Sequence, residues 1–202
     1  MNMKLTDITQ QVKNTNRYSY FVDGKYSFSL GQQQARECGL RIGQELDEPA
    51  VQFWKQQSTK GKQWDLVLGW IARRQRSVKE TRDYLTRKQL EPDRIDEFVE
   101  RLLGLKYLND ESFAQMWVRN RRELKNSSKR KIQAELRSKG VSHDLIELAL
   151  NEHDETDQSA LLECLQKRAH RYDDEQKLIA YLARQGFGYA DIKEALQTFK
   201  QE

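Results

Sequence analysis

The stretch YLARQGFGYADIKEAL, residues 181–196, places its apolar side chains at fixed intervals. Counting from Leu182, apolar residues follow at the fifth, tenth, thirteenth and fourteenth positions, and the same intervals recur when the count starts at Leu136 or Leu85. The residues at those positions are Leu90, Ile95, Phe98 and Val99 in the first copy, Val141, Ile146, Ala149 and Leu150 in the second, and Phe187, Ile192, Ala195 and Leu196 in the third. A spacing that recurs three times predicts one supersecondary unit used three times.

Two helices joined by a tight turn explain this spacing. Eight residues before the reference leucines stand three good helix N-caps, Ser77, Ser128 and Asp174. Gly140 and Gly186 come four residues after their references and suit the left-handed residue that ends many helices. The first copy has Gln89 at this place, which we expect to strain or lengthen its turn.

A third helix is expected before each cap. Its apolar residues are Leu66, Val67, Trp70 and Ile71 in the first copy, Phe113, Trp117 and Val118 in the second, and Leu161, Leu162 and Leu165 in the third. Each copy is then a three-helix repeat, and the three are predicted to span 62–109, 110–154 and 155–202. Because one repeat cannot bury its apolar face alone, we expect an all-α fold in which the repeats stack into an elongated, curved solenoid.

Residues 1–61 have a different pattern and are predicted to form a small extension that contains a β-hairpin. The segments 8–12, 18–22 and 26–30 are rich in aromatic and β-branched residues, and Asp23-Gly24 between the last two is a strong signal for a two-residue turn. Tyr18, Tyr20 and Val22 are expected to pair across from Tyr26, Phe28 and Leu30. A helix is expected from Asp47 onward, and the segment 58–62, STKGK, is interpreted as a linker.

Composition limits the class of protein. Charged residues make up 33% of the 202-residue chain and hydrophobic residues 37%, with two prolines, which favours solvated helices. We expect a cytoplasmic protein, because the chain contains no membrane span and no signal peptide, and we expect Cys38 and Cys164 to stay reduced. His143, His153 and His170 lack partners at metal-ligand spacing, and no catalytic motif is present, so neither a cofactor nor enzymatic activity is expected.

Charge is distributed unevenly along the chain. Residues 62–150 contain 20 basic and 14 acidic groups, a balance of +6, whereas residues 151–202 contain 7 and 11, a balance of −4. The densest basic run, 119–139, has nine Lys and Arg residues against Glu123 and Glu135. This polarity predicts a partner that is polyanionic or electrostatically complementary.

The chain contains four ordered motifs, which are IARRQRS at 71–77, YLNDESFA at 107–114, LRSKGV at 136–141 and YLARQGF at 181–187. They resemble motifs of the RecX recombination regulators. The family patterns are Arg-Arg-x-x-Ser, Tyr-Leu-Asp-Asp-x-x-Tyr-Ala, Leu-x-x-Lys-Gly and Tyr-Leu-x-Arg-Arg-Gly-Phe, from which this chain departs mildly at Asn109, Phe113 and Gln185. The resemblance covers about residues 64–200, and the leader before them resembles the N-terminal extension of longer family members.

The resemblance implies a function that the repeats alone do not. Members of the family bind the RecA filament on single-stranded DNA, lie in its groove, and damp its ATPase, recombinase and SOS co-protease activities without being enzymes. It therefore implies RecA assembled on single-stranded DNA as the partner of a monomeric protein, with weak direct DNA binding in addition. The cations assigned to that contact are Arg73, Arg74, Arg76, Arg119, Arg121, Arg122, Lys129, Arg130, Arg137 and Arg184.

Each of these assignments has a structural alternative. The basic run can be a solvated helix face with partners such as Glu123, and Arg73, Arg74 and Arg76 can serve the end of the preceding helix. Trp70 and Trp117 lie on apolar faces, so core packing is favoured over base stacking.

Two other functions also stay open. One is a helix-turn-helix regulator that binds DNA directly, suggested by the turn at Gly140 and the basic run before it. The other is a helical-repeat adaptor unrelated to recombination.

Overall fold

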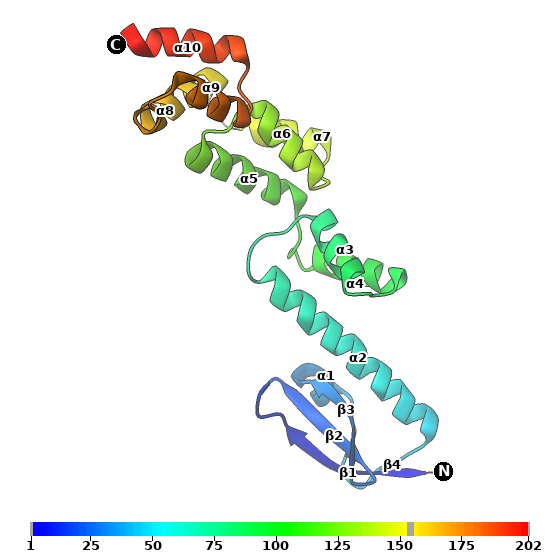
Figure 1. Ribbon diagram of the computed structural model, residues 1–202. Helices are drawn as coiled ribbons and strands as arrows, with labels where there is room; N and C mark the ends of the chain where they lie inside the picture. Colours follow the sequence, from blue (N-terminus) through cyan, green and yellow to red (C-terminus); the bar gives the residue numbers. More distant parts are fainter. Residues whose placement is uncertain (1, 153–155, 202) are drawn as a thin grey trace. The chain divides into compact units, whose positions relative to one another are not determined.

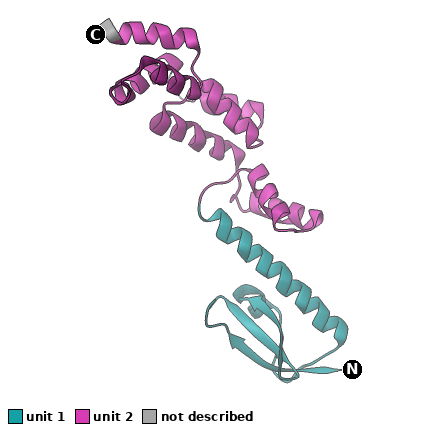
Figure 2. Cartoon of the chain, viewed as in Figure 1, with its two compact units in different colours: residues 1–73 teal, residues 74–202 magenta. Residues whose placement is uncertain are grey.

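The computed structural model describes residues 2–152 and 156–201, which form two compact units (Figure 2). Unit 1 extends to Arg73 and unit 2 begins at Arg74. The boundary expected between the second and third repeats, at 154/155, and the assessment of His153 lie outside the described residues.

Unit 1 contains a four-stranded antiparallel sheet with the strand order β3-β2-β1-β4 (Figure 1). The strands are β1 (Met3–Gln10), β2 (Arg17–Val22), β3 (Lys25–Gly31) and β4 (Glu45–Leu46), and the short helix α1 (Gln32–Glu37) follows β3. The hairpin at Asp23-Gly24 is confirmed, with φ of 48° and 75° at the two turn residues. The strand expected at 8–12 instead begins at Met3 and ends before Val12, which is 95% exposed.

The pairing expected across the hairpin holds for only part of its length. Tyr18 faces Leu30 and Tyr20 faces Phe28 as predicted, but the register then shifts, so that Tyr26 faces Phe21 and not Val22. A two-residue turn at Asp23-Gly24 requires its flanking residues to pair, and only an extra residue in β3 reconciles this pairing with the register farther along.

Helix α2 (Glu48–Ile71) runs without interruption through the segment that was interpreted as a linker. The interpretation as a linker is therefore wrong. The small residues of the segment instead allow α2 to approach the rest of unit 1 closely. Ser58 is 3% exposed and its Oγ accepts a hydrogen bond of 3.0 Å from the Ser29 N–H of β3. A Cβ atom at Gly61 would lie 2.9 Å from Gln34 Oε1 of α1.

Unit 2 contains the remaining helices. They are α3 (Val78–Arg87) and α4 (Pro92–Gly104), then α5 (Asp110–Lys125), α6 (Lys129–Ser138) and α7 (His143–Asn151), and finally α8 (Asp157–Arg168), the 3₁₀ turn η1 (Ala169–Arg171), α9 (Glu175–Arg184) and α10 (Tyr189–Gln201). The first helix expected for the first repeat is the last part of α2 and belongs to unit 1. The second and third repeats each have a separate buried core.

The spacing that predicted the repeats is confirmed by burial. The three reference leucines are 0% exposed, and every residue at the predicted intervals is at most 8% exposed. The three predicted caps each accept a backbone N–H at the start of α3, α6 or α9. Gln89 adopts φ of 59°, in the same left-handed region as Gly140 and Gly186. It does not lengthen its helix, because α3, α6 and α9 each have 10 residues.

Candidate partner-binding surface and the clamps between repeats

The first and second repeats are joined by polar contacts at the start of α3, which we call clamp 1. Ser77 Oγ donates a hydrogen bond of 2.7 Å to the Lys139 carbonyl at the end of α6. The Val78 N–H donates at 2.9 Å to Asp110 Oδ1, on the first residue of α5. The hydroxyl of the cap residue and the first backbone N–H of α3 thus find their acceptors in the following repeat.

The second and third repeats are joined in the same way at the start of α6, which we call clamp 2. The Lys129 N–H donates at 2.8 Å to Asp157 Oδ1, on the first residue of α8. The Ser128 N–H donates at 3.0 Å to the Gln185 carbonyl at the end of α9, and Lys131 Nζ donates at 2.8 Å to the Arg184 carbonyl. Asp110 and Asp157 therefore occupy equivalent positions in the two clamps.

Glycine at the turn serves the clamps as well as the helix end. A Cβ atom at Gly140 would lie 2.6 Å from Lys79 Cβ of the preceding repeat, and one at Gly186 would lie 2.3 Å from Ser128 Oγ. Ordinary side chains cannot fit at such distances, so these turns must lack a Cβ to seat against the neighbouring repeat. Gln89, at the corresponding turn of the first repeat, is exposed.

Arg122 was assigned to the partner contact, and the structure corrects this assignment. Its side chain is 2% exposed, donates at 3.0 Å to the Ser127 carbonyl, and forms an ion pair of 2.9 Å with Asp157. Arg122 therefore stabilises clamp 2 from inside and cannot reach a partner. Lys129 contributes its backbone N–H to the same clamp.

Arg121 is held against Trp117 and Glu135. Its Nε donates at 2.6 Å to Glu135 Oε2, which also accepts at 2.8 Å from Trp117 Nε1. The Arg121 guanidinium lies 4.4 Å from the centroid of the Trp117 ring, and Lys139 Nζ lies 4.8 Å from it. Arg121 thus pairs with Glu135 of α6, and the indole packs against the core of the second repeat as predicted.

Clamp 1 is extended by an ion-pair network centred on Glu80. Glu80 accepts from Arg74 at 3.1 Å and from Lys139 Nζ at 2.6 Å. Burial alone would raise the pKa of Glu80, but these two hydrogen bonds outweigh it and lower the pKa to about 2. Asp110 behaves oppositely, since burial raises its pKa despite the Val78 N–H, and the nearby charge of Glu80 adds to the rise. Arg74 is therefore a member of the network and not a free cation.

The other assigned residues differ in accessibility. Arg76 is half-buried, whereas the exposed ones are Arg73, Arg119, Arg130, Arg137 and Arg184. Arg130 and Arg137 are seven residues apart on α6, which places them on one helix face two turns apart. The basic run therefore divides into residues that join the repeats and residues that face solvent.

The clamp aspartates were missed at the level of sequence. A signal was present, because the caps Asn109 and Thr156 are each followed directly by an aspartate at the start of the first helix. Among residues 2–152 and 156–201, no cluster of three or more His, Cys, Asp or Glu could hold a metal ion. No helix in that part of the chain is both long enough and apolar enough to span a membrane.

Comparison with protein families accounts for this architecture. Models described as the first, second and third three-helix domains of RecX match residues 64–102, 109–150 and 155–196, and the model of the RecX N-terminal domain matches residues 3–47. A protein from Bacillus pumilus named "Regulatory protein RecX" is 32% identical over 200 residues, which cover 96% of this chain and 76% of that protein. This chain belongs to the RecX family.

Two further comparisons show how far the likeness extends. A relative of the same name from Listeria welshimeri is 33% identical over 77% of this chain, but the match spans only 58% of that relative's length. A crystal structure titled as regulatory protein RecX superposes with a TM-score of 0.70 at 23% identity and covers 95% of this chain and 99% of its own, which shows a shared fold. The predicted fold, three tandem three-helix units after a small strand region, is confirmed.

Proposed function

We propose that this protein is a non-enzymatic regulator that binds the RecA filament on single-stranded DNA. In this proposal it acts in the cytoplasm as a monomer and mainly inhibits the ATPase, recombinase and SOS co-protease activities of the filament. The observation that carries the proposal is the presence of all four RecX domains in order along the chain, among relatives that are named regulatory proteins.

The exposed cations of the second repeat are the proposed contact. Arg130 and Arg137 on α6 and Arg119 on α5 are exposed, and no ion pair to these side chains is found among the described residues. An exposed guanidinium can bind a carboxylate of the recombinase or a phosphate of its DNA in bidentate geometry. Arg73 and Arg184 are proposed as secondary contacts, while Arg74 belongs to clamp 1, Lys129 gives its backbone N–H to clamp 2, and Arg121 is held by Glu135 and Trp117 within the second repeat.

The test is the rate of ATP hydrolysis by the cognate RecA on single-stranded DNA, titrated with this protein. The rate is expected to fall at or below stoichiometric ratios. The double variant R130E/R137E is expected to require about tenfold more protein for the same inhibition. Exposed charges at the edge of an interface act mainly on the association rate and its salt dependence, and reversing two of them should slow association. A matched control is K13E/R41E, which makes the same charge change at exposed positions of unit 1.

Two outcomes would contradict the proposal. Unchanged ATP hydrolysis with folded wild-type protein would reject the filament as the partner. Equal loss of inhibition in both double variants would show a general effect of charge rather than a contact on α6. Binding to DNA in the absence of RecA, measured at several salt concentrations, isolates the direct contact with DNA. The slope of log affinity against log salt concentration reports how many phosphates the protein neutralises.

A further inference from the structure

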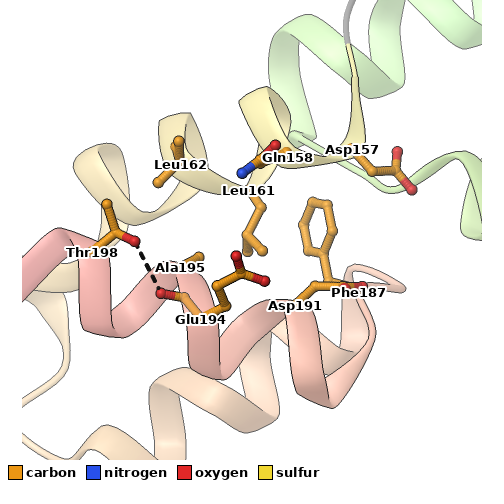
Figure 3. Close-up of a pocket in the computed structure, with 9 residues that line it drawn as sticks. All are labelled: Asp157, Gln158, Leu161, Leu162, Phe187, Asp191, Glu194, Ala195 and Thr198. Carbon is orange, nitrogen blue, oxygen red and sulfur yellow. Dashed lines mark hydrogen bonds between the residues drawn. The ribbon is translucent and has the colours of Figure 1, made fainter.

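The third repeat has an open pocket between α8 and α10 (Figure 3). Its volume is about 350 Å³, at the lower end of the range of ligand pockets. The floor is apolar and includes Leu161 and Leu162 from α8, Phe187 from the turn, and Ala195 from α10. Leu161, Phe187 and Ala195 also belong to the core of this repeat, so the floor is fixed by the fold.

Three carboxylates border this apolar floor. Asp157 is already engaged by Arg122 and the Lys129 N–H in clamp 2. Asp191 and Glu194 are exposed on α10, and no ion pair to either is found within the described part of the chain. The pocket therefore combines an apolar floor with two carboxylates available to a cationic partner, within a segment whose charge balance is −4.

The second repeat differs from the third at two positions that line this pocket. At the position of Leu162 it has Gln115, and at the position of Thr198 it has Glu152. Gln115 Nε2 donates at 2.9 Å to Glu152 Oε2, which ties α5 to the end of α7. In the third repeat Leu162 and Thr198 lie at one end of the pocket, where Thr198 Oγ1 donates instead to the Glu194 carbonyl (Figure 3).

The pair of carboxylates is also specific to the third repeat, since the first repeat has Arg94 and Glu97 at the positions of Asp191 and Glu194. The second repeat has Leu145 and Leu148 where the third has Asp191 and Glu194. Leu145 packs against the core of its repeat whereas Asp191 is exposed, so the substitutions change the chemistry of this surface. The two repeats therefore differ in the hydrogen bond that joins their first and third helices and in the charge beside the apolar surface. Both properties affect which partner can dock.

We propose that this pocket docks a basic amphipathic helix of a partner protein. An apolar side chain of that helix would enter between α8 and α10, and its Lys or Arg residues would lie against Asp191 and Glu194. Recognition of this kind places an apolar helix face in a hydrophobic groove and adds charge complementarity at the rim. The inference does not rest on the proposed function, because it concerns a surface of opposite charge to that of α6.

The probe for the test is a fluorescein-labelled helical peptide with leucines on one face and lysines and arginines on the other, and the readout is fluorescence anisotropy. Saturable binding to the wild-type chain is expected. The variant L162Q/T198E, which installs the Gln–Glu tie of the second repeat, is expected to weaken binding by about tenfold although it adds a negative charge. A general attraction between charges would be strengthened by the same variant.

Two variants and one peptide serve as controls. D191K/E194K alters only exposed residues and is expected to weaken binding by about tenfold or more, which keeps the test decisive if L162Q/T198E melts early. E111K/E123K makes the same charge change at exposed positions of α5 and is expected to leave the affinity within about twofold. A peptide whose leucines are replaced by alanine is expected not to bind.

Three results would each overturn the proposal. The first is an absence of binding to the wild-type chain. The second is undiminished binding to a folded L162Q/T198E variant. The third is an equal loss in D191K/E194K and E111K/E123K, which would mean that the peptide responds to net charge and not to the pocket.

Discussion

Clamp 1 and clamp 2 join successive repeats through the same backbone positions but with different side chains. In both, the first helix of the following repeat begins with an aspartate that accepts an N–H from the helix start before it. Clamp 1 adds an ion-pair network, Arg74–Glu80–Lys139, whose arginine is 44% exposed. Clamp 2 instead adds Arg122, whose side chain is 2% exposed.

The comparison separates what the repeat requires from what it tolerates. The aspartate and the docked turn are required, since both junctions have them. The additional arginine is 44% exposed in clamp 1 and 2% exposed in clamp 2. An ion pair near solvent contributes little free energy, whereas a buried one is costly to break. We therefore expect the two clamps to respond very differently to matched substitutions.

The largest difference is expected between R122M and R74M. R122M keeps the side-chain stem but removes charged hydrogen bonds to Asp157 and the Ser127 carbonyl, and it should lower the free energy of unfolding by about 2–3 kcal/mol. R74M removes an ion pair whose arginine is 44% exposed and leaves Glu80 paired with Lys139, so it should cost less than about 1 kcal/mol. Urea unfolding followed by circular dichroism measures both, and equal midpoints would refute the contrast.

The next largest effect concerns the turns. G140A places a Cβ in a left-handed residue and 2.6 Å from Lys79 Cβ, so it should destabilise by about 1–3 kcal/mol. Q89G relieves the same backbone conformation in an exposed turn and should stabilise by about 0.5 kcal/mol. If thermal melting showed that G140A did not destabilise the protein, the inferred close approach at Gly140 would be wrong.

The turns also show how much the sequence could predict. Apolar spacing and caps predicted the helices from the reference leucines outward, because both depend on residues near each other in the chain. The left-handed turns were predicted as well. The second reason for glycine was not accessible, because the distance from Gly140 to Lys79 depends on how two repeats pack.

The misassigned residues contained a signal that was read too locally. Arg122 was grouped with its basic neighbours, yet it continues the stripe of buried residues formed by Ala114 and Val118 at four-residue spacing. Ser58 likewise follows Val51 and Trp54 on one face of α2. In both cases helical periodicity indicated burial, while residue type alone suggested a surface cation and a linker.

Acid is expected to destabilise the protein by acting on clamp 1. The pKa of Glu80 is lowered from 4.5 to about 2 in the folded protein. Its stabilising contribution is therefore complete above pH 4.5 and is lost as the pH falls toward 2. The variant E80Q should lose this part of the pH dependence, measured by urea unfolding between pH 6 and 3. An unchanged slope would show that Arg74 and Lys139 do not favour the charged form.

The smallest effect is expected at Asp110, where the sign is opposite. Because burial raises its pKa, the charged carboxylate costs stability once the pH rises through that raised value, and the cost is absent below the ordinary value of 3.8. D110N keeps an Oδ1 acceptor for the Val78 N–H and removes the repulsion from Glu80. It should leave the free energy of unfolding at pH 7 unchanged or raise it by a few tenths of a kcal/mol. D110A, which removes the acceptor, should destabilise by about 1 kcal/mol. Equal losses in D110N and D110A would mean that clamp 1 needs the charge of this residue and not its hydrogen bond.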